Sequence, residues 1–191
     1  MNNKNKIIGI CGSASQNSGN LAILNYIAEL EKDEFDFEII DSLSDFPHFR
    51  TELTNTNVPE KIIEFRNKIL KANGIVICTP EYVFSIPSGL KNILEWCVST
   101  TAFSDKPVGL ITASTSGEKG HKELKLIMET IQSLFTKDTT LLIKGIKDKV
   151  SREGKIKDEN TKIELQKFFN SFKEYILVIN DRRNKTKLKK I

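Results

Sequence analysis

Cysteine and histidine are scarce in this sequence of 191 residues. Its three cysteines form no CxxC pair, which argues against a disulfide framework and makes the cytoplasm the expected compartment. We interpret Cys11, Cys78 and Cys97 as small buried side chains. The two histidines, His48 and His121, have no further ligands at metal spacing, so we expect no metal site.

Long hydrophobic runs are also absent. No apolar run approaches the roughly 20 residues that are needed to cross a bilayer. The first residues, MNNKNKIIGICGSAS, contain no apolar core of signal-peptide length before polar residues interrupt it. We therefore expect neither a membrane partner nor a secretory leader.

A net positive charge is missing from most of the chain, although the formal net charge of the whole is +4. The last twelve residues hold six Lys or Arg and one Asp, a net charge of +5, so the other 179 residues sum to −1. A nucleic-acid-binding domain is expected to carry a basic face. We therefore expect no nucleic-acid partner, and we divide the chain into one domain over residues 1–180 and a basic, disordered tail over residues 181–191.

Short apolar runs alternate with segments of helical period along the chain. The apolar runs predict strands at residues 7–11, 35–40, 74–79, 108–113 and 139–143. Apolar residues at helical spacing predict helices over residues 21–28, 58–69, 90–97, 124–131 and 165–176. This alternation predicts an α/β fold, a doubly wound parallel sheet with helices on both faces. In such sheets ligands bind outside the carboxyl ends of the strands, where the strand order reverses.

The first predicted strand is followed by a small, hydroxyl-rich loop over residues 12–20 that opens directly into a helix. Its main-chain amides, its serine hydroxyls and the helix dipole suit a phosphate group. The spacing matches neither GxGxxG nor GxxxxGK[ST], and no acidic pair ends the strand. From this loop alone, a phosphate site and an ordinary serine-rich turn with a helix cap both stay open.

Two further loops follow the third and fourth predicted strands. Residues 79–92 combine two prolines with Tyr82 and Phe84, so this loop can bind the edge of a flat heterocycle while an aromatic side chain shields its face. Residues 114–120 form a second flexible polar loop. We expect it to approach the same ring.

These segments match the motifs of a known family. Its first loop reads GSxRxxSxN, its second PEYNxSIPGxLKN, and its third KPVxxxxxSxGxxGG. The matching residues are Gly12, Ser13, Ser18 and Asn20 in the first segment, Pro80, Glu81, Tyr82, Ser85, Ile86, Pro87, Leu90, Lys91 and Asn92 in the second, and Lys106, Pro107, Val108, Ser114 (one position short) and Gly117 in the third. Residues 41–49 also look like the family's loop after the second strand. The chain thus resembles the NADPH-dependent FMN reductase family, the flavodoxin-like group that includes azoreductases, quinone reductases and chromate reductases.

The resemblance implies the flavodoxin-like strand order 2-1-3-4-5 and an FMN cofactor. It implies hydride transfer from NADPH or NADH, through bound FMN, to a small acceptor such as a quinone, an azo compound, a metal oxyanion or free flavin. Because the cofactor carries the chemistry, we expect no catalytic side chain. The family further implies a homodimer or homotetramer. The expected cofactor-binding residues are Gly12, Ser13, Ser15, Ser18, Gly19, Asn20, Pro80, Glu81, Tyr82, Val83, Phe84, Ser85, Ser114, Thr115 and Gly117.

The sequence also departs from the family's pattern. Ser15 stands where the family usually has an Arg that faces the FMN phosphate, Val83 replaces the usual Asn, and His121 occupies the position of the second glycine. Two alternatives therefore stay open: an electron-transfer module, and a flavin-binding protein without reductase turnover. The net charge of only −1 on the first 179 residues disfavours the electron-transfer module, because electron carriers dock on their protein partners through strong charge complementarity.

Overall fold

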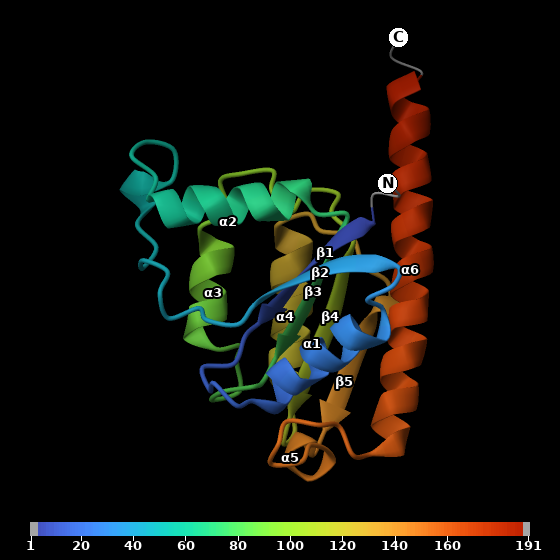
Figure 1. Cartoon of the computed structure of the whole chain (residues 1–191). Coiled ribbons are helices and arrows are strands. Elements are labelled where there is room, and N and C mark those ends of the chain that lie inside the picture. The colour runs from blue at the N-terminus through green and yellow to red at the C-terminus, as the bar shows by residue number, and fades with distance from the viewer. Residues whose placement is uncertain (1–3, 189–191) are drawn as a thin grey trace.

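The computed structural model describes residues 4–188, and side chains as far as Asp181. Its centre is a sheet of five parallel strands, β1 (Asn5–Cys11), β2 (Phe35–Ile40), β3 (Gly74–Thr79), β4 (Val108–Ser114) and β5 (Thr140–Lys144). The strand order is β2-β1-β3-β4-β5, so the predicted order is confirmed (Figure 1). All six residues of β3 are buried, as its uninterrupted apolar run predicts for a strand covered on both faces.

Helices cover both faces of the sheet. Helices α2 (Glu60–Lys71), α3 (Ser88–Glu95) and α4 (Glu118–Thr130) pack on one face, and α1 (Gly19–Leu30), the short α5 (Ile146–Lys149) and the long α6 (Glu159–Leu188) pack on the other. Side chains alternate between the two cores along each strand: Ile8 and Ile10 face α2–α4, whereas Ile7 and Cys11 face α1 and α6. The doubly wound fold is therefore confirmed.

The loops that follow β1, β3 and β4 meet at one edge of the sheet, because all five strands are parallel. The Gly12 amide donates to the Cys78 carbonyl at 2.8 Å, and the Asn20 side chain donates to the Ala113 carbonyl at 3.2 Å. The sequence did not predict α5, two short 3₁₀ turns at Thr51–Leu53 and Lys137–Thr139, or the bridge between Val150 and Ile156. Of these, α5 and the bridge lie near the first loop.

The last helix runs farther than the sequence predicted. Helix α6 continues to Leu188 and projects beyond the sheet (Figure 1), so the predicted boundary at residue 180 falls inside it. Lys and Arg are good helix formers, so a basic run does not by itself end a helix. Residues 189–191 lie outside the described part, and the division into a domain and a tail stays a prediction. Within residues 4–188, no helix has the length and hydropathy of a membrane span.

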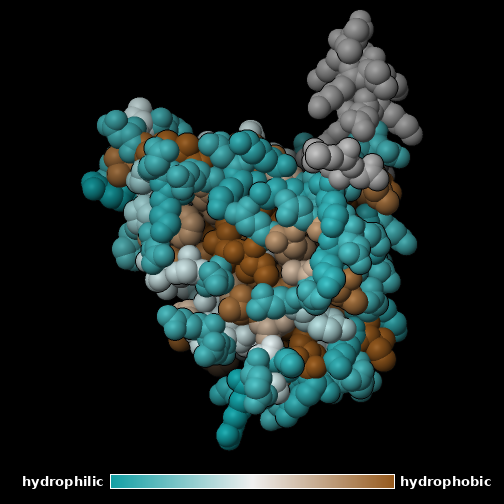
Figure 2. Space-filling view, viewed as in Figure 1, coloured by the Kyte–Doolittle hydropathy of each residue, from teal (hydrophilic) through white to brown (hydrophobic). Residues whose placement is uncertain are grey.

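The face of the molecule drawn in Figure 2 is mostly hydrophilic. Figure 2 shows one face of the molecule with hydrophobic side chains gathered near its centre, below helix α2 and beside β2. Strand β2 lies at the edge of the sheet, and four of its six residues are only partly buried. The other side chains that stand out as apolar and exposed lie at Leu30, Ile63, Leu70, Tyr82, Val83, Phe84, Val98, Leu126, Ile163, Leu177 and Val178.

Candidate active site

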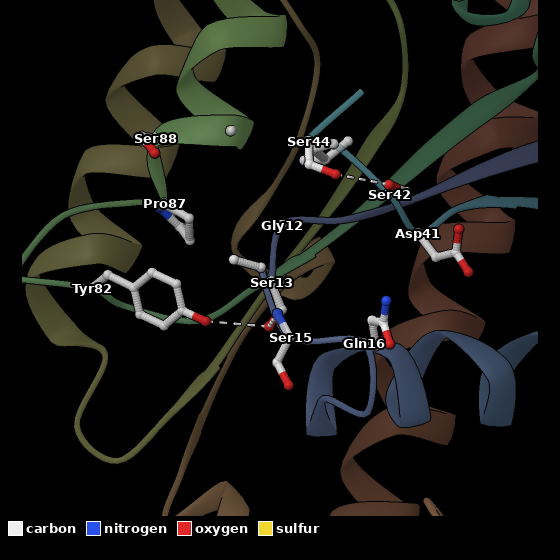
Figure 3. Close-up of a pocket in the computed structure, with 13 residues that line it drawn as sticks. Gly12, Ser13, Ser15, Gln16, Asp41, Ser42, Ser44, Tyr82, Pro87 and Ser88 are labelled. Atoms are coloured by element: carbon white, nitrogen blue, oxygen red, sulfur yellow. Dashed lines mark hydrogen bonds between the residues drawn. The ribbon is translucent and has the colours of Figure 1, made fainter. Parts of the chain in front are cut away.

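A cavity of about 560 Å³ opens at the carboxyl edge of the sheet. Three loops line it: residues 12–16 after β1, residues 41–44 after β2, and Tyr82 with residues 87–89 from the loop after β3 (Figure 3). It therefore brings together Gly12, Ser13, Ser15 and Tyr82 from the predicted set. Among the described residues, Asp41 is the only carboxylate that lines it, and no Lys or Arg does.

The base of the first loop is fixed by close packing. A Cβ atom at Gly12 would lie 2.4 Å from the Thr79 Oγ1, so only glycine fits at this position. The Ser13 hydroxyl accepts the Ser15 amide at 3.2 Å and shares a 3.3 Å hydrogen bond with the Tyr82 hydroxyl, which points toward it in Figure 3. The Ser13–Tyr82 bond links the loops after β1 and β3 across the cavity.

The end of the loop is fixed by the start of α1. The Ser18 hydroxyl caps this helix by accepting the Leu21 amide at 3.1 Å. Asn20 is buried beneath the loop, where its oxygen accepts the Cys78 thiol at 3.4 Å and its nitrogen bonds β4. Both ends of the Asn20 amide group are thus engaged inside the protein, so Asn20 positions the loop from below.

The middle of the loop keeps its donors available. In the part of the chain that the structure describes, the main-chain amides of Gln16 and Asn17 and the Ser15 hydroxyl make no hydrogen bond. They precede the N-terminus of α1, where the helix dipole favours negative charge. This donor set fits a phosphate group such as that of FMN, with neutral donors only.

The loop after β3 is tied to helix α4 by two carboxylates. The Glu81 carboxylate accepts the Gly120 amide at 2.7 Å, and the Glu123 carboxylate accepts the Ile86 amide at 3.3 Å. A Cβ atom at Gly120 would lie 3.2 Å from both Cβ and Cγ of Glu81, so the loop and the helix approach closely. Glu81 therefore reaches away from the cavity and acts as a cap on the first turn of α4.

A tight turn forms the tip of the same loop. Tyr82 and Ser85 exchange main-chain hydrogen bonds of 2.9 and 3.0 Å, and Val83 and Phe84 between them have φ angles of +52° and +63°. These features define a type I′ turn, which favours Asn and Gly. Val83 is 95% exposed and Phe84 68% exposed, and the Lys119 ammonium lies 4.3 Å from the centre of the Phe84 ring.

The predicted residues after β4 do not line the cavity. Gly117 is the N-cap residue of α4, with a φ of +85°, and a Cβ atom there would lie 2.9 Å from a methyl group of Leu142, so the fold itself requires glycine. Thr115 accepts the Gly145 amide at 3.2 Å. Ser114 is the last residue of β4. The cavity lies over β2, β1 and β3, one strand away from this segment, so cofactor contact by Ser114, Thr115 and Gly117 stays a prediction.

The cavity also contains residues that sequence reasoning missed. They are Ala14, Gln16, Asp41, Ser42, Leu43, Ser44, Pro87, Ser88 and Gly89. The strand order 2-1-3 already places the loop after β2 beside the loop after β1, so topology was the signal that could have found Asp41 and its neighbours. Ser42 and Ser44 bond each other at 3.2 Å on this wall of the cavity (Figure 3).

Burial controls the ionisation of His121 and the cysteines. The His121 Nδ1 lies 2.9 Å from the Thr112 Oγ1, and burial together with nearby Lys125 lowers the pKa of His121 to about 4. His121 is therefore neutral near pH 7. All three cysteines are buried, as predicted, and burial raises the pKa of each thiol, that of Cys97 to about 12. None of them is a thiolate at neutral pH.

Comparison with known proteins identifies the family. The sequence profile described as NADPH-dependent FMN reductase matches residues 5–146. The chain belongs to the NADPH-dependent FMN reductase family. It is an oxidoreductase that uses FMN as its flavin and NAD(P)H as its reductant, in agreement with the resemblance in its loops.

Relatives of this FMN reductase family member cover nearly the whole chain. A subunit of the NADH:(hydroxy)cinnamate reductase of Vibrio ruber is 28% identical, with 86% of this chain and 84% of the relative aligned. The 2-hydroxy-1,4-benzoquinone reductase of a Burkholderia species is 27% identical over 93% of this chain and 98% of the relative. The solved structure of a flavoenzyme NAD(P)H:(acceptor) oxidoreductase from Paracoccus denitrificans superposes with a TM-score of 0.73 at 20% identity, over 90% of this chain and 97% of that one, which shows the shared fold.

Proposed function

We propose that the chain binds FMN at the carboxyl edge of its sheet and reduces a small quinone-type acceptor with NAD(P)H. The observation that carries this proposal is the set of available donors on the first loop, next to a cavity of about 560 Å³. Relatives named as benzoquinone and quinone reductases support the acceptor class. Azo compounds, metal oxyanions and free flavin are the other acceptors to compare.

Each loop has its own part in this proposal. The amides of Gln16 and Asn17, with the Ser15 hydroxyl, hold the phosphate. Main-chain groups of residues 80–85 bind the edge of the flavin ring, and Tyr82 fixes the position of this loop through its bond to Ser13. Bound FMN supplies hydride acceptance and donation.

No side chain of the cavity is needed as a general acid or base. The ionisable groups that line it are Asp41 and Tyr82, and neither one hydrogen-bonds a histidine or a lysine among the described residues. The protein's part is to position and orient two flat rings and to keep water from the space between them. A rigid loop does this better than a mobile one. The loop after β3 is held to α4 by the Glu81 carboxylate, which accepts the Gly120 amide, and by the Glu123 carboxylate of α4, which accepts the Ile86 amide.

One experiment tests this function. The purified protein is titrated with FMN and then reduced with NADPH without oxygen, while the absorbance of oxidised flavin is followed. We expect FMN to bind and its absorbance to bleach in a single two-electron step when NADPH is added. Addition of a benzoquinone should then restore the absorbance of oxidised flavin. Accumulation of a one-electron form would favour the electron carrier. Binding without bleaching would leave a flavin-binding protein only.

We also propose that the reductase is a cytoplasmic homodimer or homotetramer. Exposed apolar side chains support an interface between copies, among them Val98 and Leu126, which are 62% and 63% exposed. The scarcity of cysteine supports the compartment. Light scattering coupled to size exclusion measures the mass in solution, and a monomer would contradict the oligomer.

A further inference from the structure

The phosphate loop carries no positive charge of its own. Residues 12–20 contain no Lys or Arg, and Asp41 is the only charged residue that lines the cavity beside them in the part of the chain that the structure describes. A phosphomonoester near pH 7 carries a charge close to −2. Hydrogen bonds from a cation to such a group are about twice as strong as neutral ones. A cation from elsewhere in the chain would therefore add substantially to FMN binding.

A second cavity, of about 350 Å³, adjoins the same loop. One wall consists of Gln16, Asn17 and Ser18 with the first turns of α1, and the other consists of residues 150–154. Gln16 lines both cavities, so the two cavities adjoin at this loop. In Figure 1, α5 and the segment after it lie at the end of the molecule where α1 begins.

The segment 150–154 is held firmly against the loop. A Cβ atom at Gly19 would lie 2.7 Å from Ile146 and 3.6 Å from Val150, so α5 packs directly under the start of α1. The Ser151 amide donates to the Lys155 carbonyl at 2.8 Å, and the Gly154 amide donates to the Ser151 carbonyl at 3.1 Å. These bonds close a turn whose second residue is Arg152.

Arg152 is exposed, lines the second cavity and has no partner among the residues that the structure describes. Side chains are described for three arginines: Arg50 pairs with Glu52, and Arg66 donates to two main-chain carbonyls. Among the described residues, the Arg152 guanidinium makes neither a hydrogen bond nor an ion pair. The nearby Lys149 differs, because it faces Asp158 at 4.0 Å.

We propose that Arg152 supplies the cation for the phosphate of FMN, from outside the loop, in place of the arginine that Ser15 replaces. This inference rests on the proposed FMN site. The loop provides neutral donors from Ser15, Gln16 and Asn17, and Arg152 adds charge-assisted donors from the 150–154 turn. Arg152 is a binding and positioning residue in this arrangement, and it takes no part in hydride transfer.

The test compares the affinities for FMN and for riboflavin, which lacks the phosphate. Dissociation constants are measured by quenching of flavin fluorescence for the wild type, Arg152→Gln and Lys155→Gln. The Lys155→Gln variant is the matched control, because it removes one exposed positive charge from the same turn. We expect Arg152→Gln to weaken FMN binding about tenfold to a hundredfold, the range of a charge-assisted hydrogen bond. Riboflavin binding should not change in either variant.

A rescue variant completes the experiment. Ser15→Arg, introduced into Arg152→Gln, should restore most of the FMN affinity, because it returns a cation to the same phosphate. Equal FMN affinities for Arg152→Gln and Lys155→Gln would overturn the inference, and so would an equal loss for FMN and riboflavin. If the wild type binds riboflavin as tightly as FMN, the inference fails while the flavin site stands. If the wild type binds neither flavin, the proposed function itself fails.

Discussion

Glu81 joins the loop after β3 to helix α4 through one carboxylate, which accepts the Gly120 amide at 2.7 Å. Replacing this acceptor with Ala leaves the first turn of α4 without its cap. We expect Glu81→Ala to lower the free energy of unfolding by about 1 kcal/mol and to weaken FMN binding, because the loop loses its anchor. Glu81→Gln keeps an acceptor oxygen and should retain most of the stability and most of the FMN affinity. Urea unfolding and FMN titration measure the two effects. Equal losses in both variants would show that charge, and not the hydrogen bond, holds the loop.

His121 provides a pH test at the same scale. Its pKa in the folded protein is about 4, because it is buried beside Thr112 and close to Lys125, whereas an unfolded chain has the usual value near 6.5. Between these two values the unfolded chain binds a proton that the folded protein does not. The free energy of unfolding should therefore fall by about 1.4 kcal/mol per pH unit from pH 6.5 toward pH 4 through this residue.

The variant His121→Asn isolates this contribution. Asn can keep a hydrogen bond to Thr112 and does not titrate, so its stability should depend less steeply on pH in that window. Urea unfolding at pH 7 and pH 5 gives the two slopes. Identical slopes for the wild type and the variant would mean that His121 is protonated in the folded protein at pH 5.

The type I′ turn at Val83 and Phe84 is the clearest strained element. A left-handed conformation costs about 1–2 kcal/mol for each residue with a side chain. Both side chains are exposed, so burial of apolar surface does not offset this cost. We expect Val83→Asn and Phe84→Gly each to stabilise the protein by about 1 kcal/mol. For a chain of this length that corresponds to a rise in Tm of about 2–4 °C. A fall in Tm in calorimetry would show that the exposed pair packs against something, such as a second copy.

Elements differ in how far the sequence could predict them. Strand β3 was predicted to the residue, because Gly and Pro bound an uncharged β-branched run. Helix α5 has four residues, too few to show a helical period, and it was missed. The turn at 83–84 was also hidden, because Val and Phe are unusual in left-handed conformation and only their neighbours force it. The hydrogen bonds that hold the loop after β3 to α4 and to Ser13 join residues far apart in the sequence, so no local sequence pattern could predict them.

At the scale of the whole molecule, topology explains which predicted site residues meet. The loops after β1 and β3 are neighbours in the order 2-1-3-4-5, and a hydrogen bond joins Ser13 and Tyr82, whose contact with the cofactor stays a prediction. The same order puts the loop after β2 on the cavity, although the motif match at residues 41–49 did not assign that loop to the cofactor site. The strand order also puts Gly117 one strand away from the cavity. The φ of +85° at this position explains why the residue is glycine. The motifs identified the family, whereas the strand order of the sheet determines which loops lie side by side at the cavity.

The projecting end of α6 offers a last test. Helix α6 holds the sheet through apolar side chains such as Phe172, Ile176 and Ile179, all buried, whereas its final turns extend beyond the sheet (Figure 1). Truncation after Arg182 removes five basic residues and none of these buried side chains. We expect Tm and turnover to change little.

Truncation after Lys173 is the matched control for that test, because it also removes Ile176 and Ile179. Loss of a large buried aliphatic side chain typically costs about 2–5 kcal/mol, so this shorter chain should melt at a clearly lower temperature or fail to fold. Differential scanning calorimetry of the two truncations gives the comparison. A large fall in Tm after the cut at Arg182 would mean that the basic end of α6 docks on the body or on another copy. Its net charge of +5 makes an acidic surface the natural partner, and added salt would then reduce the difference between the truncated and full-length chains.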